Sequence, residues 1–149
     1  MRSLEQWLDG YAKDHQDRRN QLIHKACVPA IFFTIFAAVK EIPISMGSLY
    51  LGEVIIVLVL LWYAFLSWKA FLVMMAQVAA MWWISDQLKD WSGPWYLGVL
   101  AALFILAWIG QFWGHHLEGR RPSFFNDLLF LLIGPLWVWL GHRSKEIKQ

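Results

Sequence analysis

The sequence contains little cysteine and little charge. Its one cysteine, Cys27, excludes an intrachain disulfide and gives no indication of the redox compartment. Because Cys27 opens an apolar run, we expect it to pack rather than to catalyse. Charged residues make up 16% of the 149 residues, whereas soluble domains contain roughly 25%. The net charge is +2 and no basic run is long enough to follow a phosphate backbone, which argues against nucleic acid as a partner.

The apolar residues, 58% of the chain, are concentrated in long runs. Residues 49–67 contain one charge, Glu53, and residues 95–113 contain none. Each of these runs approaches the roughly 20 residues that a helix needs to cross a hydrocarbon core. We interpret both as membrane spans, and the runs 26–39 and 70–84 as two more crossings. Tryptophans gather near the run ends, as in the interfacial belts of membrane proteins.

The last run, residues 124–140, is broken by Asn126, Asp127 and a Gly-Pro pair. We favour a re-entrant or interfacial hairpin there, and a plain fifth span remains open. The sequence therefore predicts an all-α fold, a polytopic membrane helical bundle of four to five hydrophobic helices. Residues 1–149 would form a single membrane-embedded domain.

The first 20 residues lack the apolar core of a secretory signal peptide and carry charges of both signs. They predict a short amphipathic helix over residues 3–14 that lies at the membrane surface. Its apolar residues recur with helical spacing: Leu4, Trp7, Leu8 and Tyr11. Ser3 followed by Gln6 fits a capping box at the start of this helix.

A second helix is predicted over residues 21–39, with Asn20 as its N-cap. Pro29 would kink this helix or mark where it enters the bilayer. Polar connectors over residues 40–48 and 85–94 are expected to separate the later runs.

The distribution of lysine and arginine predicts the orientation of the chain. Basic residues are concentrated before the first run, so we expect the N-terminus in the cytoplasm. Four crossings would return the chain to that side at Gly114. This parity places four histidines at the cytoplasmic face: His15, His24, His115 and His116. The membrane would be the cytoplasmic membrane in a prokaryote and the endoplasmic reticulum in a eukaryote.

The first two of these histidines are nine residues apart. On one unbroken helix they would point in opposite directions, so both can reach one metal ion only if the backbone breaks between them. We expect that break in the QDRRN segment, residues 16–20. Asn20 and His24 share a helical face, so Asn20 either caps the helix or orients His24.

In the later segment, His115 and Glu118 are neighbours if the helix continues past Trp113. His116 would point about 100° away and be a poorer partner for the same ion. Gly114 would allow close approach of the backbone. Gln111 either bonds another helix or faces the site, as does Gln77.

Imidazole and carboxylate without thiolate fit Fe(II), Zn, Mn or Ni, and argue against iron–sulfur and Cu(I) sites. Five histidines are too few for the di-iron boxes of membrane desaturases and hydroxylases. The other interpretation of these histidines is that each is a polar anchor at the membrane interface.

Two segments together resemble a known family. In the first, His15 and His24 enclose Asn20 and precede Pro29; the second, residues 108–122, reads WIGQFWGHHLEGRRP and is followed by a Gly-Pro pair. This combination resembles the small membrane family of the yeast 2-hydroxy fatty acid dioxygenase of α-oxidation. The resemblance covers roughly residues 5–35 and 105–140.

The resemblance implies an Fe(II)-dependent dioxygenase that uses O2 to convert a long-chain 2-hydroxy fatty acid into the acid one carbon shorter, with release of CO2. It implies His15, His24 and His115 as iron ligands. Asn20, Gln111 and Glu118 match the other polar positions of the family and are the candidate catalytic residues. His116 is kept as a candidate ligand, although neither it nor His142 matches a histidine of the family.

The substrate could chelate iron through its hydroxyl and carboxylate, leaving room for O2. An arginine beside the site could pair with the carboxylate: Arg18, Arg19, Arg120 or Arg121. One alternative is a non-catalytic multi-pass membrane protein, lipid-binding or scaffolding, with interfacial histidines. Another is a carrier of metal or haem.

Overall fold

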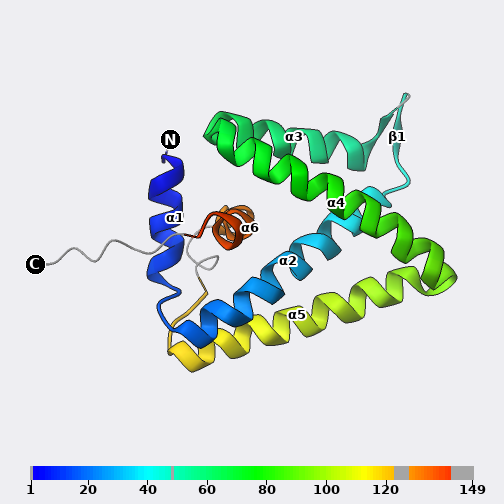
Figure 1. The fold of residues 1–149 in the computed structure, drawn as a ribbon. Coiled ribbons are helices and arrows are strands. Elements are labelled where there is room, and N and C mark those ends of the chain that lie inside the picture. The colour runs from blue at the N-terminus through cyan, green and yellow to red at the C-terminus, as the bar shows by residue number, and fades with distance from the viewer. Residues whose placement is uncertain (1, 48, 123–127, 142–149) are drawn as a thin grey trace, which may run out of the picture. The chain divides into compact units, whose positions relative to one another are not determined.

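The computed structural model describes residues 2–47, 49–122 and 128–141. These residues are almost entirely helical, which confirms the all-α prediction for the described part of the chain. The helices are α1 (Leu4–Lys13), α2 (Arg18–Lys40), α3 (Leu51–Leu66), α4 (Trp68–Ser92), α5 (Tyr96–Glu118) and α6 (Phe130–Leu140), with a short 3-10 turn η1 (Gly93–Trp95) (Figure 1). The extended elements are two-residue strands, β1 (Ser45–Met46) and β2 (Leu49–Tyr50), paired antiparallel.

The chain divides into two compact units. Unit 1 comprises residues 1–29 and 107–149, and unit 2 comprises residues 30–106. Both α2 and α5 contribute one part to each unit. That residues 1–149 form a single membrane-embedded domain therefore remains a prediction.

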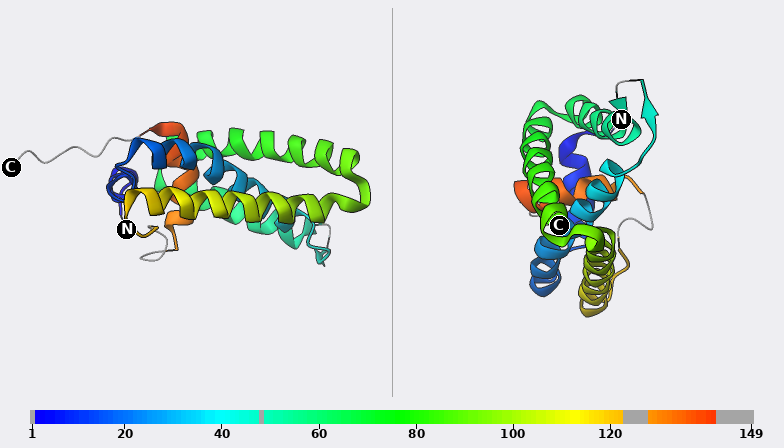
Figure 2. Two further views of the ribbon diagram at one scale, coloured as in Figure 1. Left: turned by 90° about the horizontal axis from the view of Figure 1, so that it is seen from below. Right: turned by 90° about the vertical axis from the view of Figure 1, so that its right-hand side faces the viewer.

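Unit 2 contains α3 and α4, which run antiparallel, and α4 turns through η1 into α5 (Figures 1 and 2). Its core is an apolar cluster from four helices: Phe33, Phe36, Ala37, Ile56, Met81, Tyr96 and Leu100. Gly52 lies so close to the Val39 carbonyl that a Cβ would overlap it. A larger residue at the start of α3 would therefore push it away from α2.

The segment 85–94, expected as a polar connector, is mostly helical because α4 continues to Ser92. Its polar side chains find partners beyond α4: Ser85 with Tyr96, Asp86 with Lys40, and Lys89 with Glu41. These pairs make a break in the helix unnecessary. The helix ends instead at Gly93, whose φ of 52° suits glycine, and Pro94 follows in η1.

Within the described residues, two helical stretches are long and apolar enough to cross a bilayer, Arg18–Lys40 and the region Trp68–Glu118. The predicted span 49–67 forms the 16-residue helix α3. The predicted run 124–140 forms the 11-residue helix α6 and begins within the residues that the structure does not describe. A bundle of four to five crossings is thus a proposal, and α6 alone is too short for the roughly 20 residues of a span.

In unit 1, α1 packs against α6. The capping box is confirmed, since Ser3 Oγ accepts from the Gln6 N–H and the Gln6 side chain accepts from the Ser3 N–H. Trp7 is buried and meets the Phe130 ring edge-on at 5.2 Å. The apolar face of α1, which we expected at the membrane surface, is therefore largely covered by the protein itself.

The prediction that Asn20 caps the second helix is wrong. Helix α2 begins at Arg18, and Asp17 Oδ1 accepts the Arg19 N–H at 2.7 Å, as an N-cap side chain does. Asn20 lies inside the first turn, where its side chain is available for a tertiary contact. Pro29 lies within α2, which continues to Lys40.

Candidate metal centre

Three buried histidines of unit 1 form a cluster. His15 lies between α1 and α2, His24 lies on α2 and His115 lies near the end of α5. One ligand nitrogen from each lies within 4.8 Å of the others, and the residues are 1%, 1% and 4% exposed. Histidine is the commonest protein ligand for metals, and such spacing allows one ion to contact all three.

The three imidazole rings lie close together, and each pair meets edge to face. Ring centroids are 4.4 Å apart for His15 and His24, 4.8 Å for His15 and His115, and 4.7 Å for His24 and His115. The Nε2 atoms of His24 and His115 are 3.1 Å apart. Three imidazole nitrogens at this spacing could bind one metal ion and leave further positions open.

A break in the backbone brings His15 and His24 together. Helix α1 ends at Lys13 and α2 begins at Arg18, so the break lies at residues 14–17, overlapping the QDRRN segment where we expected it. The His15 N–H still bonds to the Ala12 carbonyl, which keeps this residue close to the end of α1. On one continuous helix the two imidazoles would point in opposite directions, and this break allows them to meet.

Backbone carbonyls orient two of the imidazoles. His15 Nδ1 lies 2.7 Å from the Tyr11 carbonyl and His24 Nδ1 lies 3.0 Å from the Asn20 carbonyl, four residues earlier in each case. A carbonyl only accepts, so each Nδ1 carries the proton and each Nε2 keeps its lone pair. Ligating histidines in proteins are commonly held in this manner.

Burial also keeps His15 neutral. Desolvation lowers the pKa of His15 to about 4, outweighing the Tyr11 carbonyl and the nearby Glu118, which favour the charged form. His15 Nε2 is buried and has no hydrogen-bond partner within the described ranges. A neutral imidazole with a free lone pair is the form that binds a metal.

Glu118 lies beside the cluster and joins two segments of unit 1. One carboxylate oxygen accepts from the Gln16 N–H and the other accepts from Asn20 Nδ2. Glu118 therefore ties the end of α5 to the start of α2 and to the loop that carries His15. Asn20 is fully buried, and its backbone carbonyl holds His24.

Glycine makes this close contact possible. A Cβ at Gly114 would overlap the side-chain oxygen of Asn20, so the close approach expected at Gly114 is present. At Gly134, a Cβ would lie 3.1 Å from the Tyr11 hydroxyl, so glycine also lets α6 approach α1.

The structure does not bring His116 into the cluster. It is exposed, with its ring 6.0 Å from that of Trp113, in keeping with its expected direction on the helix. Gln111 lies one turn before His115 and is half-buried. His142 lies outside the described residues.

The arginines that we considered as partners for a substrate carboxylate are either bound to other groups of the protein or exposed. Arg19 forms an ion pair with Asp17 at 3.1 Å, and Arg120 donates to the Lys13 carbonyl. Arg18 and Arg121 are exposed.

Two aromatic residues that we did not predict from the sequence line the cluster. The Tyr11 ring stacks on His15, with centroids 4.1 Å apart and planes 3° apart. The Trp137 ring lies 5.5 Å from His15 and 5.2 Å from Tyr11. The spacing of Tyr11 four residues before His15 could have indicated its contact, but nothing distinguishes Trp137 from the other tryptophans.

A family model described as 2-hydroxy-palmitic acid dioxygenase Mpo1-like matches residues 1–146. The chain belongs to the Mpo1-like family. This confirms the resemblance drawn from the two histidine segments. No curated protein and no solved structure matches the chain.

Membership of the Mpo1-like family indicates a role related to the dioxygenation of 2-hydroxy fatty acids. The three buried histidines can hold a metal ion, which is compatible with such a role.

Proposed function

We propose that the protein is an Fe(II)-dependent membrane dioxygenase that converts a long-chain 2-hydroxy fatty acid into the acid one carbon shorter and CO2. The observation that carries the proposal is the buried cluster of His15, His24 and His115 in a chain of the Mpo1-like family. The overall reaction balances with O2 alone: the hydroxy acid and O2 give the shorter acid, CO2 and water. It therefore needs no external reductant.

The donor set fits iron. Three neutral nitrogens and no thiolate suit Fe(II), and three protein ligands leave positions for exogenous groups. Bound iron would supply the place where O2 and the hydroxy acid meet. We assign the ligand role to His15, His24 and His115, and positioning roles to Asn20 and Glu118.

The residues around the cluster would orient the ligands and exclude water. The Tyr11 and Asn20 carbonyls keep the Nδ1 protons in place. Ile133 and Leu136 of α6 are fully buried and add an apolar wall to unit 1. Such a wall strengthens electrostatic interactions inside a site and limits side reactions with water.

A membrane setting suits a long-chain substrate. The helices α2 and α5, which carry His24 and His115, belong to the stretches that could cross a bilayer. We propose that the protein is a multi-pass membrane protein with its N-terminus and site on the cytoplasmic side, where the acyl chain is supplied from the bilayer.

The test combines iron analysis with O2 consumption on 2-hydroxypalmitate, using full-length protein purified in detergent. We expect stoichiometric iron and turnover in the wild type, with both lost in alanine variants of His15, His24 or His115. Alanine variants of His116 and His142 in the same series show whether either residue supplies a further ligand. Wild-type protein that is folded but takes up no metal would contradict the proposal.

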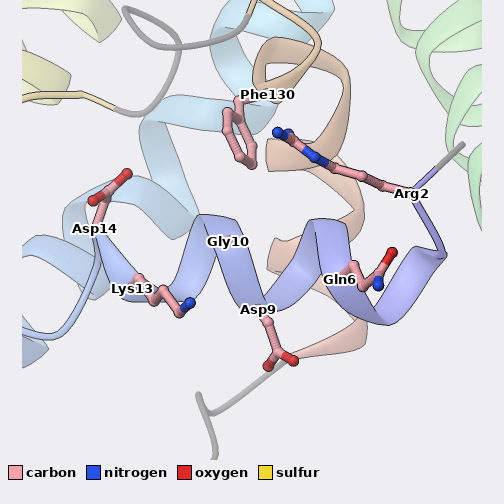
Figure 3. Close-up of a pocket in the computed structure, with 7 residues that line it drawn as sticks. All are labelled: Arg2, Gln6, Asp9, Gly10, Lys13, Asp14 and Phe130. Atoms are coloured by element: carbon pink, nitrogen blue, oxygen red, sulfur yellow. The ribbon is translucent and has the colours of Figure 1, made fainter.

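A second candidate function is a lipid-binding membrane protein without catalysis. The observation that favours it is a pocket of about 590 Å³ beside α1, lined by Phe130 and by charged residues of both signs (Figure 3). Its charged residues are Arg2, Asp9, Lys13 and Asp14. A pocket of this kind would suit a polar lipid headgroup, and metal-free protein that remains lipid-associated would favour this function.

The third alternative is a carrier of metal or haem. Bound haem with visible absorption, or tightly bound metal without O2 consumption, would favour it. The same purified protein therefore separates all three functions.

A further inference from the structure

Helix α6 brings a buried hydrogen-bond donor beside the histidine cluster. Trp137 is 4% exposed, and its ring contacts both His15 and Tyr11. Its indole Nε1 is buried and has no hydrogen-bond partner in the part of the chain that the structure describes. Buried donors in folded proteins are nearly always paired, so an unpaired one beside a candidate metal centre indicates a bound group.

The neighbouring His15 imidazole also has an unpartnered atom. His15 Nε2 is buried without a hydrogen bond, and the centroids of the His15 and Trp137 rings are 5.5 Å apart. The two atoms differ in chemistry, since the imidazole lone pair can bind a metal whereas an indole N–H can only donate. A metal ion that carries a ligand with a hydrogen-bond acceptor would satisfy both atoms.

We propose that Trp137 donates its indole N–H to a carboxylate oxygen of the acid bound at the histidine cluster. This inference rests on the proposed function and names the residue that recognises the substrate's acid group. A 2-hydroxy acid that chelates through its hydroxyl and one carboxylate oxygen leaves its second carboxylate oxygen without a ligand. Burying that oxygen is costly unless a donor meets it.

The charged residues nearby do not supply this donor. Arg19 is paired with Asp17, and Arg120 is exposed and donates to the Lys13 carbonyl. Glu118 is an acceptor for Gln16 and Asn20. Trp137 is a buried donor that contacts a cluster imidazole and has no hydrogen-bond partner among the described residues.

The experiment measures the dissociation constant of 2-hydroxypalmitate for full-length protein loaded with Zn(II), a redox-inert substitute for iron. Trp137→Phe keeps an aromatic ring and removes the N–H. We expect binding to weaken by about tenfold or more, as for a hydrogen bond to a charged group, while one Zn(II) per chain is retained. Trp139→Phe, on the same helix but 61% exposed, should bind as the wild type does.

The methyl ester of 2-hydroxypalmitate tests the choice of oxygen, because it lacks the carboxylate charge. Wild type and Trp137→Phe should differ far less in their affinity for the ester than for the acid. Equal weakening for acid and ester would overturn the assignment to the carboxylate, and unchanged affinity for the acid would overturn the inference as a whole.

A spectroscopic measurement on unmutated protein covers the case in which Trp137→Phe does not fold. With ¹⁵N-labelled indoles, adding the acid to the Zn(II)-loaded wild type should move one slowly exchanging indole N–H signal downfield. Replacing Zn(II) with paramagnetic Co(II) identifies that signal as one next to the metal. An indole signal near the metal that does not respond to the acid overturns the inference.

These outcomes separate the inference from the proposed function. Wild-type protein that binds no metal, or binds metal but no acid, contradicts the dioxygenase and the role of Trp137 with it. Protein that binds both, with Trp137→Phe equal to the wild type, contradicts only the role of Trp137.

Discussion

The main buried clusters of the two units differ in polarity. At the centre of unit 1 lie His15, Asn20, His24 and His115, all polar and all buried. The main buried cluster of unit 2 is built instead from apolar and aromatic side chains of α2, α3, α4 and α5. Burying polar groups stabilises a fold only when they find partners, so the polar centre of unit 1 indicates a site.

Helix α5 shows the same contrast within one element. Tyr96 and Leu100, near its start, belong to the apolar cluster of unit 2, while Gly114 and His115, near its end, belong to the centre of unit 1. The change in polarity along one helix shows that its first part contributes to apolar packing, whereas its last part contributes a histidine to the candidate metal centre. Substitutions in the two parts should therefore have different consequences.

The largest effect is expected from removing a ligand in unit 1. His24→Ala should lower iron affinity by more than about 100-fold, the upper end for residues that only orient ligands, because one of three donors is lost. Iron per chain and its dissociation constant measure this. His116→Ala, exposed on α5, should keep its iron; equal loss in both variants would contradict the three-histidine centre.

Glu118→Gln should have the next largest effect. The amide would place an NH2 group against the Gln16 N–H or Asn20 Nδ2, both of which are donors. We expect a loss of about 10–100-fold in iron affinity, since groups behind the ligands have effects of this size. Glu53→Gln, at the start of α3 in unit 2, is the matched control. Unchanged affinity in Glu118→Gln would mean that Glu118 does not position the ligands.

The same substitution at two glycines of α5, one in each unit, tests the contrast between the two units. Gly114→Ala places a Cβ against the buried Asn20 side chain and should destabilise the protein by about 1–3 kcal/mol. Gly98→Ala meets no atom within 4 Å and should change stability by zero to about 1 kcal/mol in the favourable direction. Thermal unfolding in detergent measures both, and similar destabilisation in the two variants would remove the contrast.

The smallest effect is expected from an ion pair of unit 2. Glu41→Gln removes the partner of Lys89, whose side chain is 50% exposed. Exposed pairs of this kind contribute up to about 1 kcal/mol, and iron binding should be unchanged. A loss of iron in Glu41→Gln would show that unit 2 contributes to the centre.

Local signals in the sequence were sufficient to predict much of the candidate site. The break between His15 and His24 followed from their nine-residue spacing. Helix α5 does continue past Trp113 to Glu118, which is the condition under which His115 and Glu118 are neighbours on one helical face. The capping box at Ser3 and Gln6 was likewise local. Helical spacing also separated His116 from His115.

Tertiary contacts account for what the sequence did not predict. Asparagine is a residue type favoured at the N-cap, which is why the sequence indicated Asn20. Asp17 caps α2 instead, and the Asn20 side chain donates to Glu118, 98 residues away. The polar stretch after Ile84 continues as helix because its partners come from other elements. Nothing in the local sequence indicated that Trp137 lies beside the histidines, because its contact with His15 depends on how α6 packs on α1.

The most direct test of the central claim is X-ray absorption on the full-length protein loaded with one Zn(II) per chain. We predict about three imidazole nitrogens at about 2.0–2.1 Å from the metal in the wild type, and one imidazole fewer in His24→Ala. A wild-type spectrum without imidazole scattering, or the same spectrum in His24→Ala, would contradict a metal centre built from His15, His24 and His115.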